Sequence, residues 1–263
     1  MTIRLTYVLT LAVVQLLLGT GIARAEVRFV EATPVFNSVQ DRAHLLITGQ
    51  ITSEDVLSVD RLLPSAVMQT HFRTWGGTYK PLVLVNSPGG DLMAAMKIGQ
   101  ALRKVRAWVW VDKAAECASA CVFILAGGVE RNIVPGARVR IHRPYFEKTS
   151  FADLSLQDAQ TLYGKQAQFA KSYLRDMGMS DALFERMLRV PSQKAVLLNT
   201  AELETLGLQG EDPAYQEWNR ANQEKSLGEE RFRQVQGLTD CVNSGTEQSI
   251  CEKKWGLKFS FGK

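Results

Sequence analysis

The sequence Ala115-Glu116-Cys117-Ala118-Ser119-Ala120-Cys121-Val122-Phe123-Ile124-Leu125 decides the fold and places one hydroxyl in a turn of small residues. The run from Ala120 to Ala126 carries no charge and no helix breaker, which predicts a buried helix that opens just after Ser119. Free backbone N–H groups at a helix N-terminus stabilise an anion. A serine nucleophile needs such a place, because its attack on a carbonyl generates an oxyanion. Serving only as the N-cap of the helix is the alternative role for Ser119.

Strands and helices alternate around this turn. Apolar runs predict buried strands at 43–51, 81–86, 107–111 and 137–142, and amphipathic patterns predict helices at 52–70 and 92–105. This alternation indicates an α/β fold with a mostly parallel β-sheet. Ligands of such sheets bind outside the carboxyl ends of the strands, and Gly90, Ser119 and His142 each fall at such an end.

The glycine turn Ser87-Pro88-Gly89-Gly90 joins the strand at 81–86 to the helix at 92–105. Glycine is required where φ is unusual or where a ligand approaches the backbone closely. The turn therefore fits a site that presents backbone N–H groups, although a plain turn has the same composition.

The second half of the chain is predicted to be helical. Helices are expected at 156–176, 181–188 and 200–206, then a polar helix from Pro213 to about Gln236 and a tail from Leu238 that is rich in Gly, Ser and Lys. The predicted organisation is a signal peptide at 1–25, an α/β domain at 26–212 and a disulfide-stapled helical appendage at 213–263.

The N-terminus is typical of a secretory signal peptide. Arg4 is followed by a mostly apolar run at 5–18 and by the small-x-small cleavage site Ala23-Arg24-Ala25. The run is too short for a confident membrane span, although an uncleaved anchor is the alternative. No later stretch is long and apolar enough to span a bilayer. We therefore expect a secreted protein, periplasmic if the source is a Gram-negative bacterium.

Four cysteines in an exported chain predict disulfides. The simplest pairing is local, with Cys117–Cys121 around the Ser119 turn and Cys241–Cys251 stapling a C-terminal loop. Neither pair has the spacing of a zinc site and the chain has 3 histidines, so no metal and no cofactor are expected. A net charge of +4 without a basic stripe argues against nucleic-acid binding.

Three segments together resemble one known family. They are Val83-Leu84-Val85-Asn86-Ser87-Pro88-Gly89-Gly90-Asp91, Cys117 through Gly127, and Arg138-Val139-Arg140-Ile141-His142-Arg143-Pro144. They resemble the proteolytic subunit of Clp protease (ClpP) and its crotonase-like superfamily, as do the strand at 46–51 and the "AE…GL" segment at 201–208. The resemblance covers about 43–210 and implies superhelical βα units with flanking helices.

The resemblance implies a set of roles. Ser119 would be the nucleophile, His142 the general base, and the N–H groups of Gly90 and Ala120 the oxyanion hole. It also implies a peptide or protein substrate. Members of the superfamily commonly form rings or trimers, so a homo-oligomer is expected, whereas an exported chain is not expected to meet an ATP-driven unfoldase.

One member of the family's catalytic triad is missing. The family has an aspartate ahead of the "AE…GL" helix, whereas 189–200 contains no acid. The matching position is Pro191 or Ser192 counted from one side and Ala195 counted from the other. His142 must then be oriented by Ser192, by a backbone carbonyl or by an acid from elsewhere. A lysine base, as in the signal-peptide peptidase branch, would have to be Lys148 or Lys165, which lack any motif.

The sequence therefore leads to an exported serine hydrolase that acts on peptide bonds through a Ser119–His142 dyad. A catalytically silent crotonase-like domain that binds a peptide or an envelope partner is the alternative. An ester or acyl-thioester hydrolase is a third reading, because an oxyanion hole serves many acyl substrates.

Overall fold

The computed structural model describes residues 25–30, 44–63, 81–145 and 153–258. The predicted signal peptide at 1–25 lies outside these residues except for Ala25, and so does Lys148. The chain divides into two compact units, the first ending at Gly210 and the second beginning at Glu211.

A six-stranded sheet forms the centre of the first unit, in the order β1-β2-β3-β4-β6-β9. Strands β2, β3, β4 and β6 pair in parallel, and β1 lies antiparallel to β2. The predicted mostly parallel sheet is confirmed. The sequence does not reveal β1 or β6, because charged residues interrupt their apolar pattern. The strands are β1 (Glu26–Val30), β2 (His44–Thr48), β3 (Leu82–Asn86), β4 (Trp108–Val111), β6 (Glu130–Ile133) and β9 (Gly210–Glu211).

A second, three-stranded sheet carries the segment around Ser119. It consists of β5 (Glu116–Ala118), β7 (Arg138–Ile141) and β8 (Val196–Leu197), with β5 parallel and β8 antiparallel to β7. The Ser87 N–H donates to the Glu116 carbonyl at 2.7 Å, and the Ala118 N–H donates to the Ser87 carbonyl at 3.0 Å. These bonds hold β5 directly beside the turn that follows β3.

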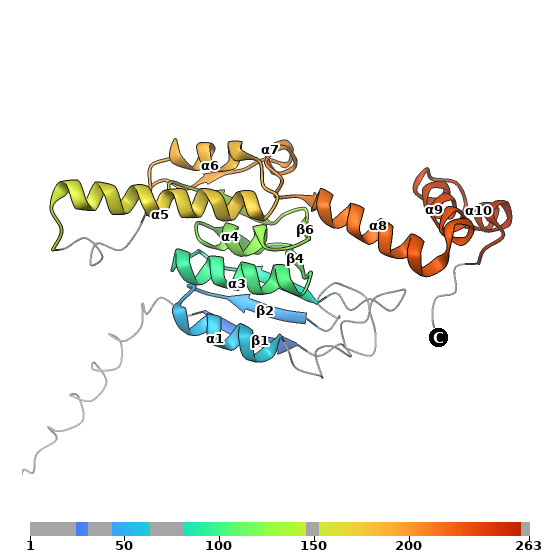
Figure 1. Cartoon of the computed structure of the whole chain (residues 1–263), viewed down its shortest axis with the longest axis horizontal. Helices are drawn as coiled ribbons and strands as arrows, with labels where there is room; N and C mark the ends of the chain where they lie inside the picture. The colour runs from blue at the N-terminus through green and yellow to red at the C-terminus, as the bar shows by residue number, and fades with distance from the viewer. Residues whose placement is uncertain (1–24, 31–43, 64–80, 146–152, 259–263) are drawn as a thin grey trace, which may run out of the picture. The chain divides into compact units, whose positions relative to one another are not determined.

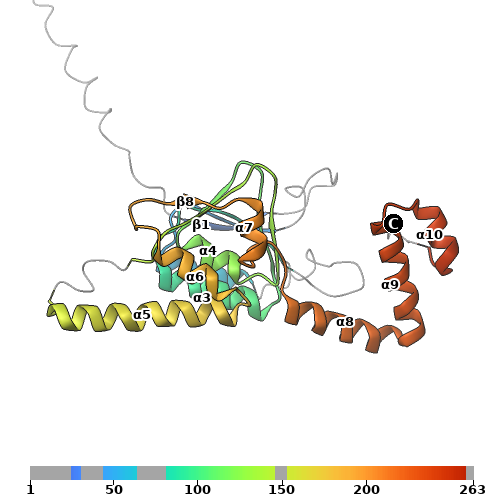
Figure 2. The same cartoon turned by 90° about the horizontal axis from the view of Figure 1, so that it is seen from above.

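Helices cover one face of the main sheet (Figures 1 and 2). Helix α1 packs beside α3, and α3 packs against α4. The side chains between sheet and helices are fully buried, among them Ile47, Val83 and Val109. Burial of such side chains is the main stabilising contribution to the fold. The helices of this unit are α1 (Ser53–Leu62), α3 (Leu92–Lys104), α4 (Cys121–Ala126), α5 (Leu156–Asp176), α6 (Asp181–Leu188) and α7 (Thr200–Thr205).

Tyr173 of α5 fixes the position of α4, the helix that follows Ser119. Its hydroxyl donates to the Phe123 carbonyl at 2.6 Å, and the two rings lie 5.8 Å apart. Burial raises the pKa of Tyr173 far above its usual value, so the hydroxyl stays protonated and remains a donor. The contacts of Tyr173 thereby fix the short helix α4 against α5.

The second unit contains α8 (Pro213–Leu227), α9 (Glu229–Asn243) and α10 (Gln248–Trp255). The prediction of a single helix to about Gln236 is wrong, because Gly228 adopts a φ of 77° and ends α8. The bond between Cys241 and Cys251 joins α9 to α10, with 5.7 Å between the Cα atoms, rather than stapling a loop.

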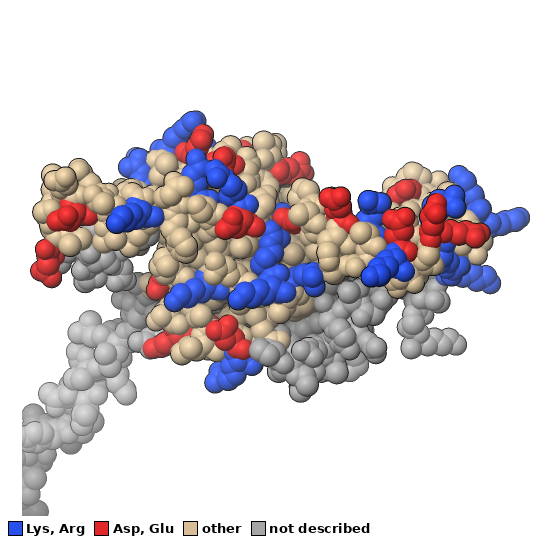
Figure 3. All heavy atoms as spheres, in the orientation of Figure 1, with Lys and Arg blue, Asp and Glu red and all other residues tan. Residues whose placement is uncertain are grey.

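The surface mixes charges of both signs. On the face in Figure 3, Lys and Arg side chains are spread over several elements with Asp and Glu between them. No helix in the described ranges has both the length and the apolar character needed to cross a membrane.

Candidate active site

Ser119 stands on a sharp turn between β5 and α4. Its φ is 56°, a left-handed conformation that costs a residue with a side chain about 1–2 kcal/mol. Its N–H donates to the Arg140 carbonyl at 3.0 Å, and its carbonyl accepts from the Val122 N–H at 3.1 Å. These bonds hold the strained turn in place, and strain of this kind is typical of functional sites.

The hydroxyl of Ser119 does not cap the helix. Ala120 occupies the N-cap position of α4, and no side chain caps it. Within the described ranges the Ser119 hydroxyl makes no hydrogen bond, and the residue is half-buried. The alternative role as N-cap therefore does not explain a serine at this position.

The glycine turn lies against the Ser119 turn. Ser87 is 1% exposed, and its hydroxyl donates to the Gly49 carbonyl at 2.6 Å and accepts from the Gly89 N–H at 3.1 Å. A Cβ at Gly89 would lie 2.6 Å from the Ser119 Cβ and 3.0 Å from the Ala120 nitrogen. Only glycine allows the two turns to approach this closely.

Among the described residues, the N–H groups of Gly90 and Ala120 have no hydrogen-bond acceptor. Gly90 forms a parallel bridge with Ile51, in which the Ile51 N–H bonds the Gly89 carbonyl and the Asp91 N–H bonds the Ile51 carbonyl. This pattern directs the Gly90 N–H away from Ile51. Neither that N–H nor the Ala120 N–H donates to any described residue. Unpaired backbone donors are rare in folded proteins unless water or a ligand accepts from them.

His142 follows the strand next to the one that Ser119 follows. Ala118 is paired with Arg140 in the parallel ladder of β5 and β7, so Ser119 and His142 stand at the same sheet end. The Nδ1 atom of His142 lies 2.8 Å from the Arg143 carbonyl oxygen, and the ring stacks on Tyr145 at 5.8 Å. No hydrogen bond between described residues joins His142 to Ser119. Such bonds often tighten only when substrate is bound.

The Arg143 carbonyl sets the tautomer of His142. A carbonyl oxygen only accepts, so the Nδ1 atom must carry the proton. In the neutral ring Nε2 is then unprotonated and free to take a proton. Of the three groups that the sequence leaves open for orienting this histidine, the structure therefore places a backbone carbonyl on it.

The β7–β8 ladder ends beside His142 and Ala195, and Ala195 is one of the positions that the sequence allows for the missing acid. Ile141 is paired with Val196 in this antiparallel pair, so one further step places Ala195 opposite His142. This placement favours Ala195 over Pro191 and Ser192 as the matching position. Ala195 is exposed, and Ser192 makes no hydrogen bond to His142.

A disulfide closes the Ser119 turn. The structure pairs Cys117 with Cys121, with 5.2 Å between the Cα atoms, and both residues are fully buried. The bond links β5 to the first residue of α4 and so spans Ser119. Within the described ranges, no group of three or more His, Cys, Asp and Glu residues is arranged to hold a metal ion.

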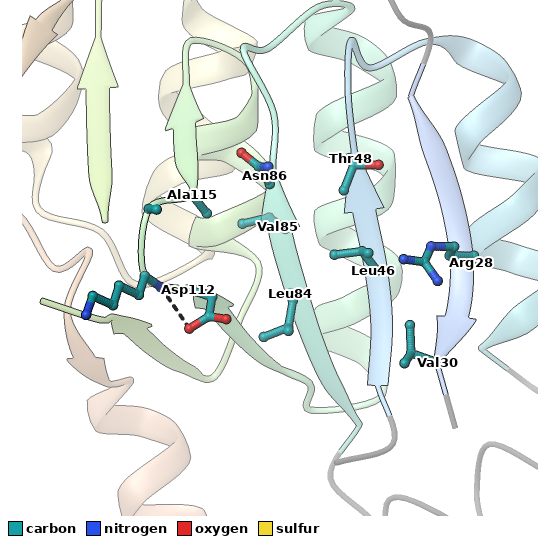
Figure 4. A pocket seen from close by; sticks show the side chains of 11 residues that line it. Arg28, Val30, Leu46, Thr48, Leu84, Val85, Asn86, Asp112 and Ala115 are labelled. Carbon is teal, nitrogen blue, oxygen red and sulfur yellow. Dashed lines mark hydrogen bonds between the residues drawn. The ribbon is translucent and has the colours of Figure 1, made fainter. Parts of the chain in front are cut away.

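A cavity of about 520 Å³ opens beside this region and includes neither Ser119 nor His142 (Figure 4). The cavity could not be predicted from the sequence, because only strand pairing brings Arg28, Leu46 and Leu84 to one face of the sheet. The cavity is lined by side chains of β1, β2, β3 and the segment 112–115, namely Arg28, Val30, Leu46, Thr48, Leu84, Val85, Asn86, Asp112, Lys113, Ala114 and Ala115.

The fold and the two apposed turns define an α/β protein with a peptidase-like architecture. Residues 77–208, half of the chain, match the family model described as Clp protease. The chain belongs to the Clp protease family.

Curated relatives match a shorter segment. The chain is 36% identical over 81 residues to the ATP-dependent Clp protease proteolytic subunit 1 of Mycolicibacterium paratuberculosis. It is 38% identical over 80 residues to the subunit of the same name from Corynebacterium efficiens. Each match covers 29% of this chain and 38% of the relative, so the chain matches well under half the length of these relatives.

Solved structures give weaker similarities. A mutant of the membrane-bound stomatin-specific protease 1510-N has a TM-score of 0.46 and 20% identity, covering 62% of this chain and 75% of that one. A mutant of ClpP1 from Listeria monocytogenes has a TM-score of 0.45 and 18% identity, covering 62% of this chain and 86% of that one.

The strained turn leads to a prediction about stability. We expect Ser119→Gly to raise the free energy of unfolding by about 1 kcal/mol relative to Ser119→Ala, because only glycine adopts a φ of 56° without strain. Denaturant unfolding of the two variants measures the difference. Equal midpoints with equal slopes would show that the turn is not strained.

Proposed function

We propose that this protein is an exported serine hydrolase that cleaves peptide bonds. In this proposal Ser119 is the nucleophile, His142 is the general base, and the N–H groups of Gly90 and Ala120 bind the oxyanion. The observation that carries the proposal is the position of the strained Ser119 turn beside two backbone N–H groups that lack acceptors among the described residues. Preorganised donors of this kind are the largest single contribution in many acyl transfers.

The reaction follows from this assignment. The Ser119 Oγ attacks the scissile carbonyl carbon while His142 Nε2 takes the hydroxyl proton. The tetrahedral oxyanion accepts from the Gly90 and Ala120 N–H groups. The C–N bond then breaks, and the departing amine takes the proton from His142. Water attacks the acyl-serine with the help of the same nitrogen, which releases the acid and restores Ser119.

Two features support export. Residues 1–25 have the composition of a signal peptide, and the four cysteines pair into two disulfides. Disulfides persist in oxidising compartments and are rare in the cytosol. The proposed location is the periplasm of a Gram-negative cell. The word "subunit" in the names of the curated relatives supports the further proposal that the chain assembles with copies of itself.

The test is labelling of the oxidised protein with a fluorophosphonate, followed by peptide mapping. We expect modification at Ser119 that is lost in Ser119→Ala and in His142→Ala. Ser192→Ala is the matched control, because it removes a nearby hydroxyl outside the proposed site. Labelling at another residue, or none on the folded oxidised protein, would contradict the proposal.

A catalytically silent binding domain is the second candidate. The absence of an acid at Ala195 favours it, since a neutral carbonyl cannot stabilise a positively charged imidazolium as a carboxylate does. In that case the surface at Ser119 would bind a peptide or an envelope protein, and Ser119→Ala would bind it equally well. A panel of ester, thioester and peptide substrates separates the remaining hydrolase classes.

A further inference from the structure

The carbonyl that orients His142 belongs to Arg143, which donates two hydrogen bonds to one short segment of the chain. The Arg143 N–H donates to the Val190 carbonyl at 2.8 Å, and the Arg143 Nε donates to the Leu188 carbonyl at 2.8 Å. The main chain and the side chain of Arg143 are thus bound to the same short segment. These two bonds hold the Cα of Arg143, to which the carbonyl is attached, against this segment.

The acceptors lie at the end of α6. Leu188 is the last residue of this helix, and the last carbonyls of a helix have no partner within it. A guanidinium group is well suited to such a carbonyl, because the C-terminal end of a helix carries partial negative charge. Val190 follows shortly and is buried, so the segment is anchored in the core.

We propose that Arg143 is a positioning residue that takes over the orienting task of the missing triad acid. Its side chain and N–H hold the Cα of Arg143 in place, and the carbonyl that accepts the Nδ1 proton of His142 is attached to this Cα. This inference rests on the proposed function for its effect on rate, but the orientation of the ring is measurable without any activity.

The expected size of the effect is modest. Arg143 is exposed, so water competes for its hydrogen bond to Leu188, and the N–H bond to Val190 remains after a side-chain substitution. Loss of one such bond corresponds to a change of about fivefold. We expect Arg143→Met to lower the rate of Ser119 labelling and kcat by about this factor, with KM unchanged.

The decisive measurement is ¹⁵N NMR of the histidine ring at a pH where it is neutral. The chain has 3 histidines, so the signals of His142 are assigned by their loss in His142→Ala. The wild type should show the tautomer protonated at Nδ1, and Arg143→Met should shift the population toward the tautomer protonated at Nε2. An unchanged tautomer in Arg143→Met would overturn the proposal.

Further variants separate positioning from charge and from general damage. Arg143→Lys keeps the positive charge but lacks the Nε donor, so it should behave like Arg143→Met. Arg189→Met removes a neighbouring exposed arginine and should change neither the tautomer nor the rate. Adding Ala195→Asp to Arg143→Met should restore the Nδ1 tautomer, because a carboxylate would then orient the ring directly.

The two proposals fail in different ways. If Ser119 is not labelled but the tautomer shifts in Arg143→Met, the proposed hydrolase is wrong and the positioning role stands. If Ser119 is labelled and both tautomer and rate are unchanged in Arg143→Met, the hydrolase stands and the positioning role is wrong.

Discussion

Gly89→Ala is expected to lower the rate of Ser119 labelling at least a thousandfold. The new Cβ would lie 2.6 Å from the Ser119 Cβ and 2.8 Å from the Ala118 carbonyl oxygen, and both distances are shorter than atoms tolerate. The φ of 103° at this position adds backbone strain of about 1–3 kcal/mol. The turn must move away from Ser119, and the Gly90 N–H moves with it.

The size of this rate loss follows from the two effects of the movement, the loss of an oxyanion donor and the displacement of the nucleophile. Loss of one oxyanion donor costs about 10²–10³ in rate, and displacement of the nucleophile adds to this. Labelling rates of wild type and variant, with circular dichroism to confirm that the sheets persist, measure the effect. Gly164→Ala is the matched control, because a Cβ there meets nothing within 4 Å. A Gly89→Ala protein that labels at the wild-type rate would show that the two turns do not act together.

Ala195→Asp is expected to raise kcat for peptide hydrolysis by about tenfold. The ladder of β7 and β8 places this residue opposite His142, and its exposure means that a carboxylate there stays in contact with water. An acid at this position would accept the Nδ1 proton and stabilise the imidazolium that forms during the reaction. Loss of the acid in a complete triad costs about 10⁴, chiefly through the wrong tautomer. The Arg143 carbonyl already fixes the tautomer here, so only part of that factor remains to be gained.

Two variants make this prediction specific. Ala195→Asn offers an acceptor without the charge and should give little gain. Ser192→Asp places an acid at the position reached by the other count along the sequence, and it should give no gain. A larger gain from Ser192→Asp than from Ala195→Asp would mean that the ladder register is not the one that operates in solution.

The main elements of the fold could be predicted because their patterns are local. The run Leu82–Asn86 has the continuous apolar pattern of a buried strand, and α5 and α6 begin at the predicted residues because Ser155 and Ser180 cap their N-termini. The edge strand β1 could not be predicted in this way. Its residues are paired through a ladder to β2, and their own sequence shows no continuous apolar run.

In the candidate site too, some features could be predicted from the local sequence and others depend on the folded chain. Gly90 and His142 could be selected from the sequence because each lies at the end of a recognisable strand, and Ser119 because it lies in a small-residue turn before an apolar run, although β5, the short strand before it, is not predicted. The orienting group could not be selected, since every residue has a carbonyl and only the folded chain shows which one reaches His142. The two counts along the sequence also give different positions for the missing acid, and only strand pairing shows that Ala195 lies next in register to His142.

The bond between Cys117 and Cys121 has a practical consequence for anyone who purifies this protein. It forms a small covalent ring that contains Ser119, so the geometry of the turn depends on the redox history of the sample. In protein made in a reducing cytosol the two thiols would stay reduced and the ring would not form. Such a sample could be inactive because this disulfide is absent. The chain should therefore be produced through an oxidising export route, and its thiol content should be checked before any assay.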